Sequence, residues 1–400
     1  MASIGTYVIY TIMICAVIGA VASIIDNESP LGKEFNSGLH SIGHIFIPVA
    51  GIMAAIPYLS AFISSVVGPL FQAVNADPAM AATTIIAVDM GGYQLAETLS
   101  QSKEGWILAS ITGFMAGATI IFSIPVGLAM LDKEDHQYMA VGVMCGVLSI
   151  PIGVLVSCVA MALMDVSIRP DINASGEATY QLALNAAQVL GDIAPLVIFC
   201  ILLATCLKLF PELMIKLFLG FGRLMYAAIT LVLVFSIVEY FTGFFSKVFG
   251  VWGFAPIIAD EEDQFRALEI AGYIGIMLSG AFPMVYLMNR FLQRPMQWVG
   301  DRLGLSSAGT AGLLAAAANV LAMFRLVKDM PPRDKILVIS FAVCGAFMFG
   351  DHLAFSANFQ PTIILPLLMG KLMGGMAGFV IAMWIQKTSG QSTPEPHMPG

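Results

Sequence analysis

Long apolar runs recur along the whole chain and alternate with short polar stretches. About 20 consecutive apolar residues form a helix long enough to span the ~30 Å hydrocarbon core of a bilayer. The pattern therefore predicts an all-α polytopic membrane protein with about nine transmembrane helices. The predicted spans are 4–25, 43–66, 106–130, 138–163, 186–208, 214–241, 268–290, 335–355 and 361–385.

Two further apolar segments are interrupted and differ from ordinary spans. Segment 78–98 is broken at Asp89 and the glycines that follow it, and segment 306–325 is rich in Ala with Asn319 in its middle. Each half has roughly 10 residues, which is about 15 Å of helix and half the thickness of the bilayer. We expect both segments to be broken or re-entrant; if both spanned instead, the chain would have eleven transmembrane helices.

The distribution of Lys and Arg favours re-entrant segments. If both interrupted segments enter and leave on the same side, 13 basic residues lie in loops on one side of the membrane and 4 on the other. If both segments span, the two sides are nearly equal. Because cytoplasmic loops carry the excess of basic residues, the N-terminus is predicted outside and the C-terminus in the cytoplasm.

Short matches at a nearly constant offset predict an internal repeat. Gly51–Met53 recurs as Gly275–Met277 at an offset of 224, and Gly117–Ala118 recurs as Gly345–Ala346 at an offset of 228. An odd number of spans separates equivalent points, so the second copy is predicted to be inverted. Interrupted segments at matching positions of inverted repeats point to a substrate site near the middle of the membrane.

The repeat divides the chain into two related halves joined by a linker. We expect two transmembrane helices in the linker and disorder in the polar, Pro-rich tail. The predicted parts are 1–40 with the first transmembrane helix and a loop, 41–163 as repeat 1, 164–267 as the linker, 268–385 as repeat 2, and 386–400 as the tail.

Composition excludes several classes of protein. Of the 400 residues 58% are hydrophobic and only 11% charged, against about 25% charged in soluble domains, so the solvent of this chain is lipid. The net charge of −8 leaves no basic surface for nucleic acid. The six cysteines lie in apolar runs without metal-site spacing, and nucleotide-binding and hydrolase motifs are absent. The sequence thus predicts neither an enzyme nor a bound cofactor or metal.

Asp89 is the first candidate for chemistry. A carboxylate at membrane depth costs roughly 2.5–3.5 kcal/mol, so we expect it to be a counter-ion for a cationic substrate, with Gly91 and Gly92 letting backbone carbonyls approach. The alternative is a helix cap, and the two roles are compatible. Tyr93 offers either a cation–π face or apolar packing.

A second polar island contains Asp351 and His352. These side chains are expected either to bind an ammonium group or relay a proton, or simply to be solvated at the membrane surface. Ser123 is the repeat partner of Asp351 and joins the candidate site. Asn319 and Asn358 are candidates for bonding a substrate hydroxyl, with contact between helices as the equal alternative.

Two features lie outside this set of candidates. For Lys371, inside an apolar helix, three interpretations stay open: it reaches the membrane surface, pairs with Asp351, or repels cations. The pair Gly113 and Gly117 has the spacing that lets helices pack closely.

Four strings resemble the EutH family of bacterial ethanolamine permeases: VDMGGY (Val88–Tyr93), IFSIPVGL (Ile121–Leu128), GDHLAFSAN (Gly350–Asn358) and MGKLMGG (Met369–Gly375). They occur in order over both predicted repeats. The resemblance implies a multi-pass protein of the bacterial inner membrane that takes up ethanolamine for an ethanolamine-utilisation pathway. Its oligomeric state is open, with a homo-oligomer as one option.

The expected substrate suggests a mechanism. Ethanolamine has a primary amine that is mainly protonated at neutral pH, by analogy with Lys. Facilitated uniport of this cation, driven by its gradient and the membrane potential, needs no second ion. The alternatives are a proton- or sodium-coupled transporter of another small solute and a membrane-embedded enzyme acting on a lipid headgroup.

Overall fold

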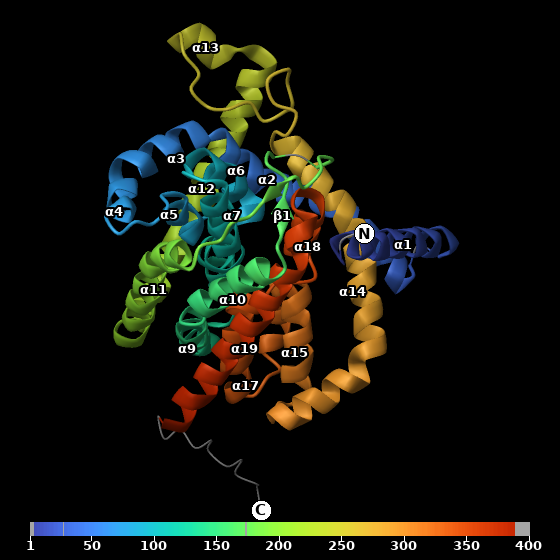
Figure 1. The fold of residues 1–400 in the computed structure, drawn as a ribbon. Helices are drawn as coiled ribbons and strands as arrows, with labels where there is room; N and C mark the ends of the chain where they lie inside the picture. The colour runs from blue at the N-terminus through green and yellow to red at the C-terminus, as the bar shows by residue number, and fades with distance from the viewer. Residues whose placement is uncertain (1–3, 27, 173, 389–400) are drawn as a thin grey trace, which may run out of the picture.

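A computed structural model of the chain describes residues 4–26, 28–172 and 174–388. Helices dominate this part of the chain (Figure 1). Two strands of two residues each, β1 (Ser167–Ile168) and β2 (Tyr180–Gln181), pair antiparallel in the loop before the first linker helix. The predicted disordered tail lies outside the described residues, except for 386–388, which end the last helix.

The helices follow in chain order. Those of the N-terminal part are α1 (Ile4–Ile25), α2 (Pro30–Ala54), α3 (Ile56–Phe62), η1 (Ile63–Val67), α4 (Gly68–Gln72), α5 (Ala79–Ile85), η2 (Val88–Met90), α6 (Gly92–Leu99), α7 (Lys103–Thr112), η3 (Gly113–Ser123), α8 (Ile124–Met130), η4 (Lys133–Asp135), α9 (His136–Val147) and α10 (Ile150–Leu163). Those that follow are α11 (Ala186–Leu209), α12 (Pro211–Thr242), α13 (Phe244–Phe249), α14 (Ala267–Leu303), α15 (Ser307–Ala318), α16 (Val320–Val327), α17 (Pro332–Gly345), α18 (Asp351–Phe359), η5 (Pro361–Ile363) and α19 (Ile364–Thr388).

The predicted fold class is confirmed. In the described part of the chain, eight helical stretches are long and apolar enough to cross a membrane. The span expected at 43–66 is divided, because α2 begins at Pro30 with Ser29 as its N-cap and ends at Ala54. Pro57 then starts a separate helix, where its missing N–H costs nothing.

The eighth expected span, 335–355, is two helices. α17 ends at Gly345, and α18 begins only at Asp351. Between them Phe347 adopts a positive φ of 60°, and the N–H groups of Phe347 and Phe349 donate to the carbonyls of Ala316 and Ala317 at the end of α15. Backbone groups freed by the break are thus satisfied by another segment, and the break is buried inside the protein, where irregular backbone is tolerated in a membrane protein. The apolar pattern continues through the break and conceals it.

Each interrupted segment forms a helical hairpin whose ends meet. Its helices have 7 to 12 residues, too few to span a bilayer, and they pack against each other. At the mouth of the first hairpin, Asp77 accepts the N–H of Gln101 at 2.9 Å. At the mouth of the second, Asp334 accepts the N–H of Ser306 at 2.7 Å. Both segments therefore enter and leave on the same side.

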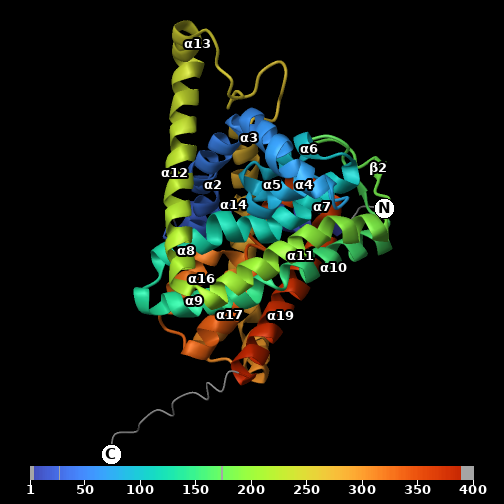
Figure 2. The same ribbon diagram turned by 90° about the vertical axis from the view of Figure 1, so that its left-hand side faces the viewer.

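The two hairpins lie toward opposite ends of the molecule. In Figure 1, α5 and α6 are on the side of α13, whereas α15 is toward the end of α19. In Figure 2, α5 and α6 are again on the side of α13, and α16 is nearer the end of α19. The two hairpins also correspond in sequence. Ala79 and Ser307 start them and Leu99 and Val327 end them, and each pair of positions is 228 residues apart. This offset equals the larger of the two found between the short sequence matches, and the inverted repeat stays a prediction.

The helix Lys103–Met130, built from α7, η3 and α8, is the central element. Almost all residues of its most apolar stretch are buried inside the protein. Its middle, η3, is an 11-residue π-helix, a geometry often found at functional sites. The first hairpin and α17 both pack against it. Gly117 makes this approach feasible, since a Cβ there would lie 2.3 Å from the carbonyl oxygen of Ile86, which confirms the predicted close packing.

Candidate functional site

The break in the first hairpin places Asp89 at its inner end. A short 3-10 turn, η2, carries Asp89 between α5 and α6. Gly91 ends this turn with φ of 91°, a left-handed conformation that favours glycine. A Cβ on Gly92 would lie 2.5 Å from the carbonyl oxygen of Ala87, so the backbone folds back tightly there. Both glycines thus act by shaping the turn that holds the carboxylate.

The break between α17 and α18 brings the second polar island to the same place. Asp351 and His352 occupy the first turn of α18, not the end of a long helix. Gly350 lies directly against the second hairpin, because a Cβ there would be 2.2 Å from the carbonyl oxygen of Ala318. A helix N-terminus carries partial positive charge and stabilises a nearby carboxylate such as Asp351.

Asp89 and His352 face each other across the two breaks. The Asp89 Oδ1 to His352 Nε2 distance is 4.0 Å, and their side chains are 17% and 2% exposed. Asp351 is half-buried and close enough to Asp89 for the two carboxylates to repel each other. The structure therefore assembles three of the predicted site residues into one polar centre, although Asp89 is more than 260 positions from the other two in sequence.

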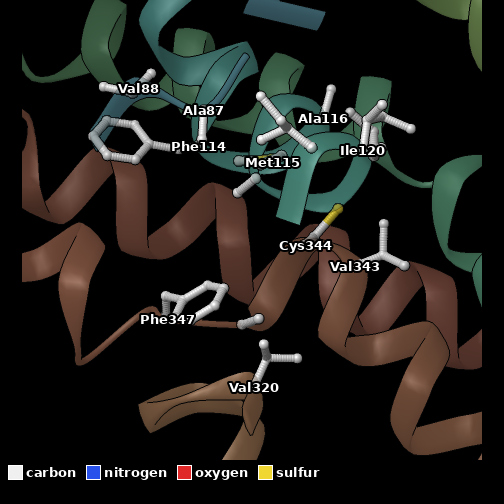
Figure 3. Close-up of a cluster of buried hydrophobic side chains, with 14 of the residues drawn as sticks. Ala87, Val88, Phe114, Met115, Ala116, Ile120, Val320, Val343, Cys344 and Phe347 are labelled. Atoms are coloured by element: carbon white, nitrogen blue, oxygen red, sulfur yellow. The ribbon is translucent and has the colours of Figure 1, made fainter. Parts of the chain in front are cut away.

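Apolar side chains enclose this polar centre. The His352 imidazole lies between the rings of Phe114 and Phe347, with centroids at 5.0 and 5.2 Å. Its Nδ1 is buried and has no hydrogen-bond partner among the described residues. Figure 3 shows the surrounding apolar cluster, in which the labelled residues are Ala87, Val88, Phe114, Met115, Ala116, Ile120, Val320, Val343, Cys344 and Phe347. Charges held here are poorly screened and interact strongly.

Lys371 of α19 also reaches this centre. Its ammonium group donates to the carbonyl oxygen of Phe114 at 2.9 Å, and the residue is 1% exposed. It does not reach the membrane surface. It also forms no ion pair within 4.0 Å of a carboxylate in the described structure, although it interacts electrostatically with Asp89.

Sequence reasoning did not find Phe114, Phe347 or Gln360. Phe347 carries no signal in the sequence, because its role follows from the break that the apolar pattern conceals. Phe114 is one of many aromatic residues in apolar runs. Gln360 had a weak signal: it is a polar residue two positions after the string that ends at Asn358.

Tyr93 is a packing residue in this structure. It is 1% exposed, its ring lies 4.7 Å from that of Trp106 and 5.3 Å from that of Phe355, and its hydroxyl accepts from Gln360 Nε2 at 2.8 Å. The carbonyl of Tyr93 accepts from Trp106 Nε1 at 3.0 Å. These contacts fasten α6 to α7 and α18 beside the centre.

Replacing Tyr93 by Phe is expected to lower the free energy of unfolding by only about 1 kcal/mol. Gln360 Nε2 retains a second acceptor, the carbonyl of Arg169 at 2.9 Å, and the ring contacts are unchanged. Tyr93→Ala removes the ring and should cost about 3–5 kcal/mol. Thermal unfolding of the purified variants in detergent measures both. Equal losses for the two variants would show that the hydroxyl, and not the ring, dominates.

The other predicted site residues are bonded to backbone. Ser123 donates to the carbonyl of Ala118 at 3.2 Å and lines a small, mainly apolar cavity with Val320 and Phe324. Asn319 caps α16 by accepting the N–H of Leu321 at 2.8 Å. Asn358 donates to the carbonyls of Tyr273 and Ala354 at 2.9 Å each. Asn358 thus joins α18 to α14, the alternative left open by the sequence, whereas Asn319 acts as a helix cap.

A known protein family matches this chain over most of its length. The model of the family described as ethanolamine utilisation protein EutH matches residues 4–385. The chain belongs to the EutH family. All four strings that suggested this resemblance lie inside the match, and two of them supply Asp89, Asp351 and His352.

Curated relatives of this EutH-family chain cover most of its length. A protein of Listeria monocytogenes named "Probable ethanolamine permease EutH" is 34% identical over 384 residues, 96% of this chain and 94% of the relative. One of Escherichia coli with the same name is 35% identical over 360 residues, 88% and 85% of the two chains. The uncharacterised protein YxeR of Bacillus subtilis is 31% identical over 368 residues, 92% and 91%. The name permease describes a transporter and not an enzyme. No solved structure matches the chain.

Proposed function

We propose that this protein is a permease of the bacterial inner membrane that takes up protonated ethanolamine by facilitated uniport. The observation that carries the proposal is the surroundings of the Asp89 carboxylate. Its carboxylate lies at the inner end of a hairpin and is 17% exposed. Among the described residues, His352 is the only basic side chain within 4.0 Å. A carboxylate in such surroundings needs a cation to offset its desolvation.

The size and charge of ethanolamine match this centre. A primary ammonium group can take the place of water at Asp89, in the way that buried charges are compensated by partners. The rings of Phe114 and Phe347 offer apolar faces to the short carbon chain. Two relatives with 34% and 35% identity bear the name of an ethanolamine permease, which supports the choice of this amine.

The two hairpins suggest how access alternates. Their breaks meet at the centre, whereas the hairpins themselves lie toward opposite ends of the molecule. Movement of one predicted repeat against the other would expose the centre first to one side and then to the other. In this proposal the cation moves through the protein with Asp89 as its counter-ion at the midpoint.

Uniport of a cation predicts a defined response to voltage. A membrane potential of ~100 mV, negative inside, supplies about 2.3 kcal/mol per charge and should drive roughly 50-fold accumulation of ethanolamine. The test uses purified protein in sealed proteoliposomes, with a potassium diffusion potential set by valinomycin and labelled ethanolamine outside. Accumulation should follow the imposed potential with one charge per substrate and should not need a pH or sodium gradient.

The rival functions give different results in the same vesicles. Accumulation at zero potential that requires a proton or sodium gradient would identify a coupled transporter. Counterflow driven by other solutes better than by ethanolamine would assign another substrate. Turnover of lipid headgroups in detergent, without a sealed compartment, would identify an enzyme.

A further inference from the structure

Lys371 is a buried basic residue placed where a cation is expected to be transported. Its ammonium group is anchored on the carbonyl of Phe114 in η3. It lies beyond 4.0 Å of the Asp89 carboxylate in the described structure, yet near enough to act on it electrostatically. The uniport mechanism given above assigns it no role.

The packing of α19 fixes this cation in the interior. A Cβ on Gly370 would lie 2.5 Å from the carbonyl oxygen of Gly153, and one on Gly375 would lie 3.0 Å from the carbonyl oxygen of Phe341. The helix therefore contacts α10 and α17 at backbone distance on both sides of Lys371. A lysine in an apolar helix usually extends its flexible stem until the ammonium group reaches water. The close packing of α19 leaves Lys371 no such path.

The net charge of the centre follows from its four ionisable side chains. Asp89 and Asp351 contribute two negative charges. His352 contributes none as a neutral imidazole, because an imidazolium would donate through both nitrogens and its buried Nδ1 has no acceptor in the described part of the chain. Lys371 contributes one positive charge. With Asp89, Asp351 and Lys371 all in their ionised forms, the centre has one net negative charge, which a single monovalent cation neutralises.

We propose that Lys371 determines the valence of the substrate: it is a fixed internal cation that leaves room for one monovalent amine and rejects dications. The inference rests on the proposed uptake of protonated ethanolamine and deepens it. A dication of the same length would leave the centre with an uncompensated positive charge in low-dielectric surroundings. Desolvation of the second positive charge costs more free energy than its attraction to the carboxylates returns. Without Lys371 the two carboxylates would match a dication.

Ethylenediamine is the probe for this proposal. It has the length of ethanolamine and carries a second amine in place of the hydroxyl, so at mildly acidic pH it is a dication. The measurement is the ratio of its inhibition constant to the half-saturating concentration of ethanolamine, in proteoliposomes at one fixed pH. Because both amines are compared in the same protein, a loss of active protein cancels from the ratio.

Lys371→Met is expected to shift this ratio toward ethylenediamine by about tenfold or more, the effect of removing one nearby charge at an effective dielectric constant of about 20. Lys371→Arg keeps the charge and should keep the wild-type preference for the monovalent amine. Lys387→Met is the matched control, an exposed lysine of the same helix, and should leave the ratio unchanged. An unchanged ratio in Lys371→Met would overturn the inference while leaving ethanolamine uptake established.

A charge-balanced pair keeps the test decisive if Lys371→Met does not fold. Asp351→Asn combined with Lys371→Met restores one net negative charge, and its ratio should move toward ethylenediamine by about tenfold relative to Asp351→Asn alone. Equal ratios in these two variants would also overturn the inference. Absence of ethanolamine uptake by the wild-type protein would instead remove the proposed function, so the two failures are distinguishable.

Discussion

Asp89→Asn is expected to abolish saturable ethanolamine uptake while leaving the protein folded in the membrane. The amide has the size of the carboxylate and can keep the turn of η2, but it cannot compensate an ammonium group that has lost its water. Breaking a buried charge pair by removing one partner costs about 3–5 kcal/mol. The initial rate of uptake at a given low ethanolamine concentration should therefore fall at least ~100-fold. Initial rates in proteoliposomes over a range of ethanolamine concentrations measure the loss.

The matched control for this substitution is Asp132→Asn. Asp132 is an exposed aspartate in the loop before η4, and its side chain forms no cap bond there. Uptake by this variant should equal that of the wild-type protein, and both variants should elute as folded protein in detergent. Saturable uptake by Asp89→Asn at the wild-type rate would remove Asp89 from the mechanism, and with it the observation on which the proposed function depends.

Gly117→Val should disrupt the contact between η3 and the first hairpin. Its Cβ would lie 2.3 Å from the carbonyl oxygen of Ile86 and 2.7 Å from that of Thr83, and neither backbone atom can move aside as a side chain could. We expect a loss of about 3 kcal/mol in unfolding free energy, the upper part of the range for overpacked interiors. The apparent Tm in detergent should fall on the order of 5 °C.

Gly220→Val is the control for added volume. Gly220 is an exposed glycine of α12, and a Cβ there would meet nothing within 4 Å. This variant carries the same change in helix propensity as Gly117→Val, so its Tm should stay close to that of the wild-type protein. Equal Tm values for Gly117→Val and Gly220→Val would mean that the hairpin does not pack against η3 as closely as described.

Much of the architecture could be predicted from the sequence because the bilayer imposes simple rules. Length and apolar composition decide which segments can cross, and this predicted the all-α fold and most of the spans. Asp89, Gly91 and Gly92 interrupt an apolar run, so the first hairpin was visible without a structure. Asp351 and His352 were conspicuous for the same reason: ionisable residues in such a chain are costly and therefore few.

Only the tertiary structure decided how these residues meet. The break between α17 and α18 is invisible in the apolar pattern, because its backbone N–H groups are satisfied by Ala316 and Ala317 of another segment. Lys371 could not be placed by the sequence, since its partner is the carbonyl of Phe114, a backbone atom 257 positions away. Composition and spacing determine which segments enter the membrane. Contacts between distant backbone and side-chain atoms determine where charge is held, because each depends on the path of both segments in space.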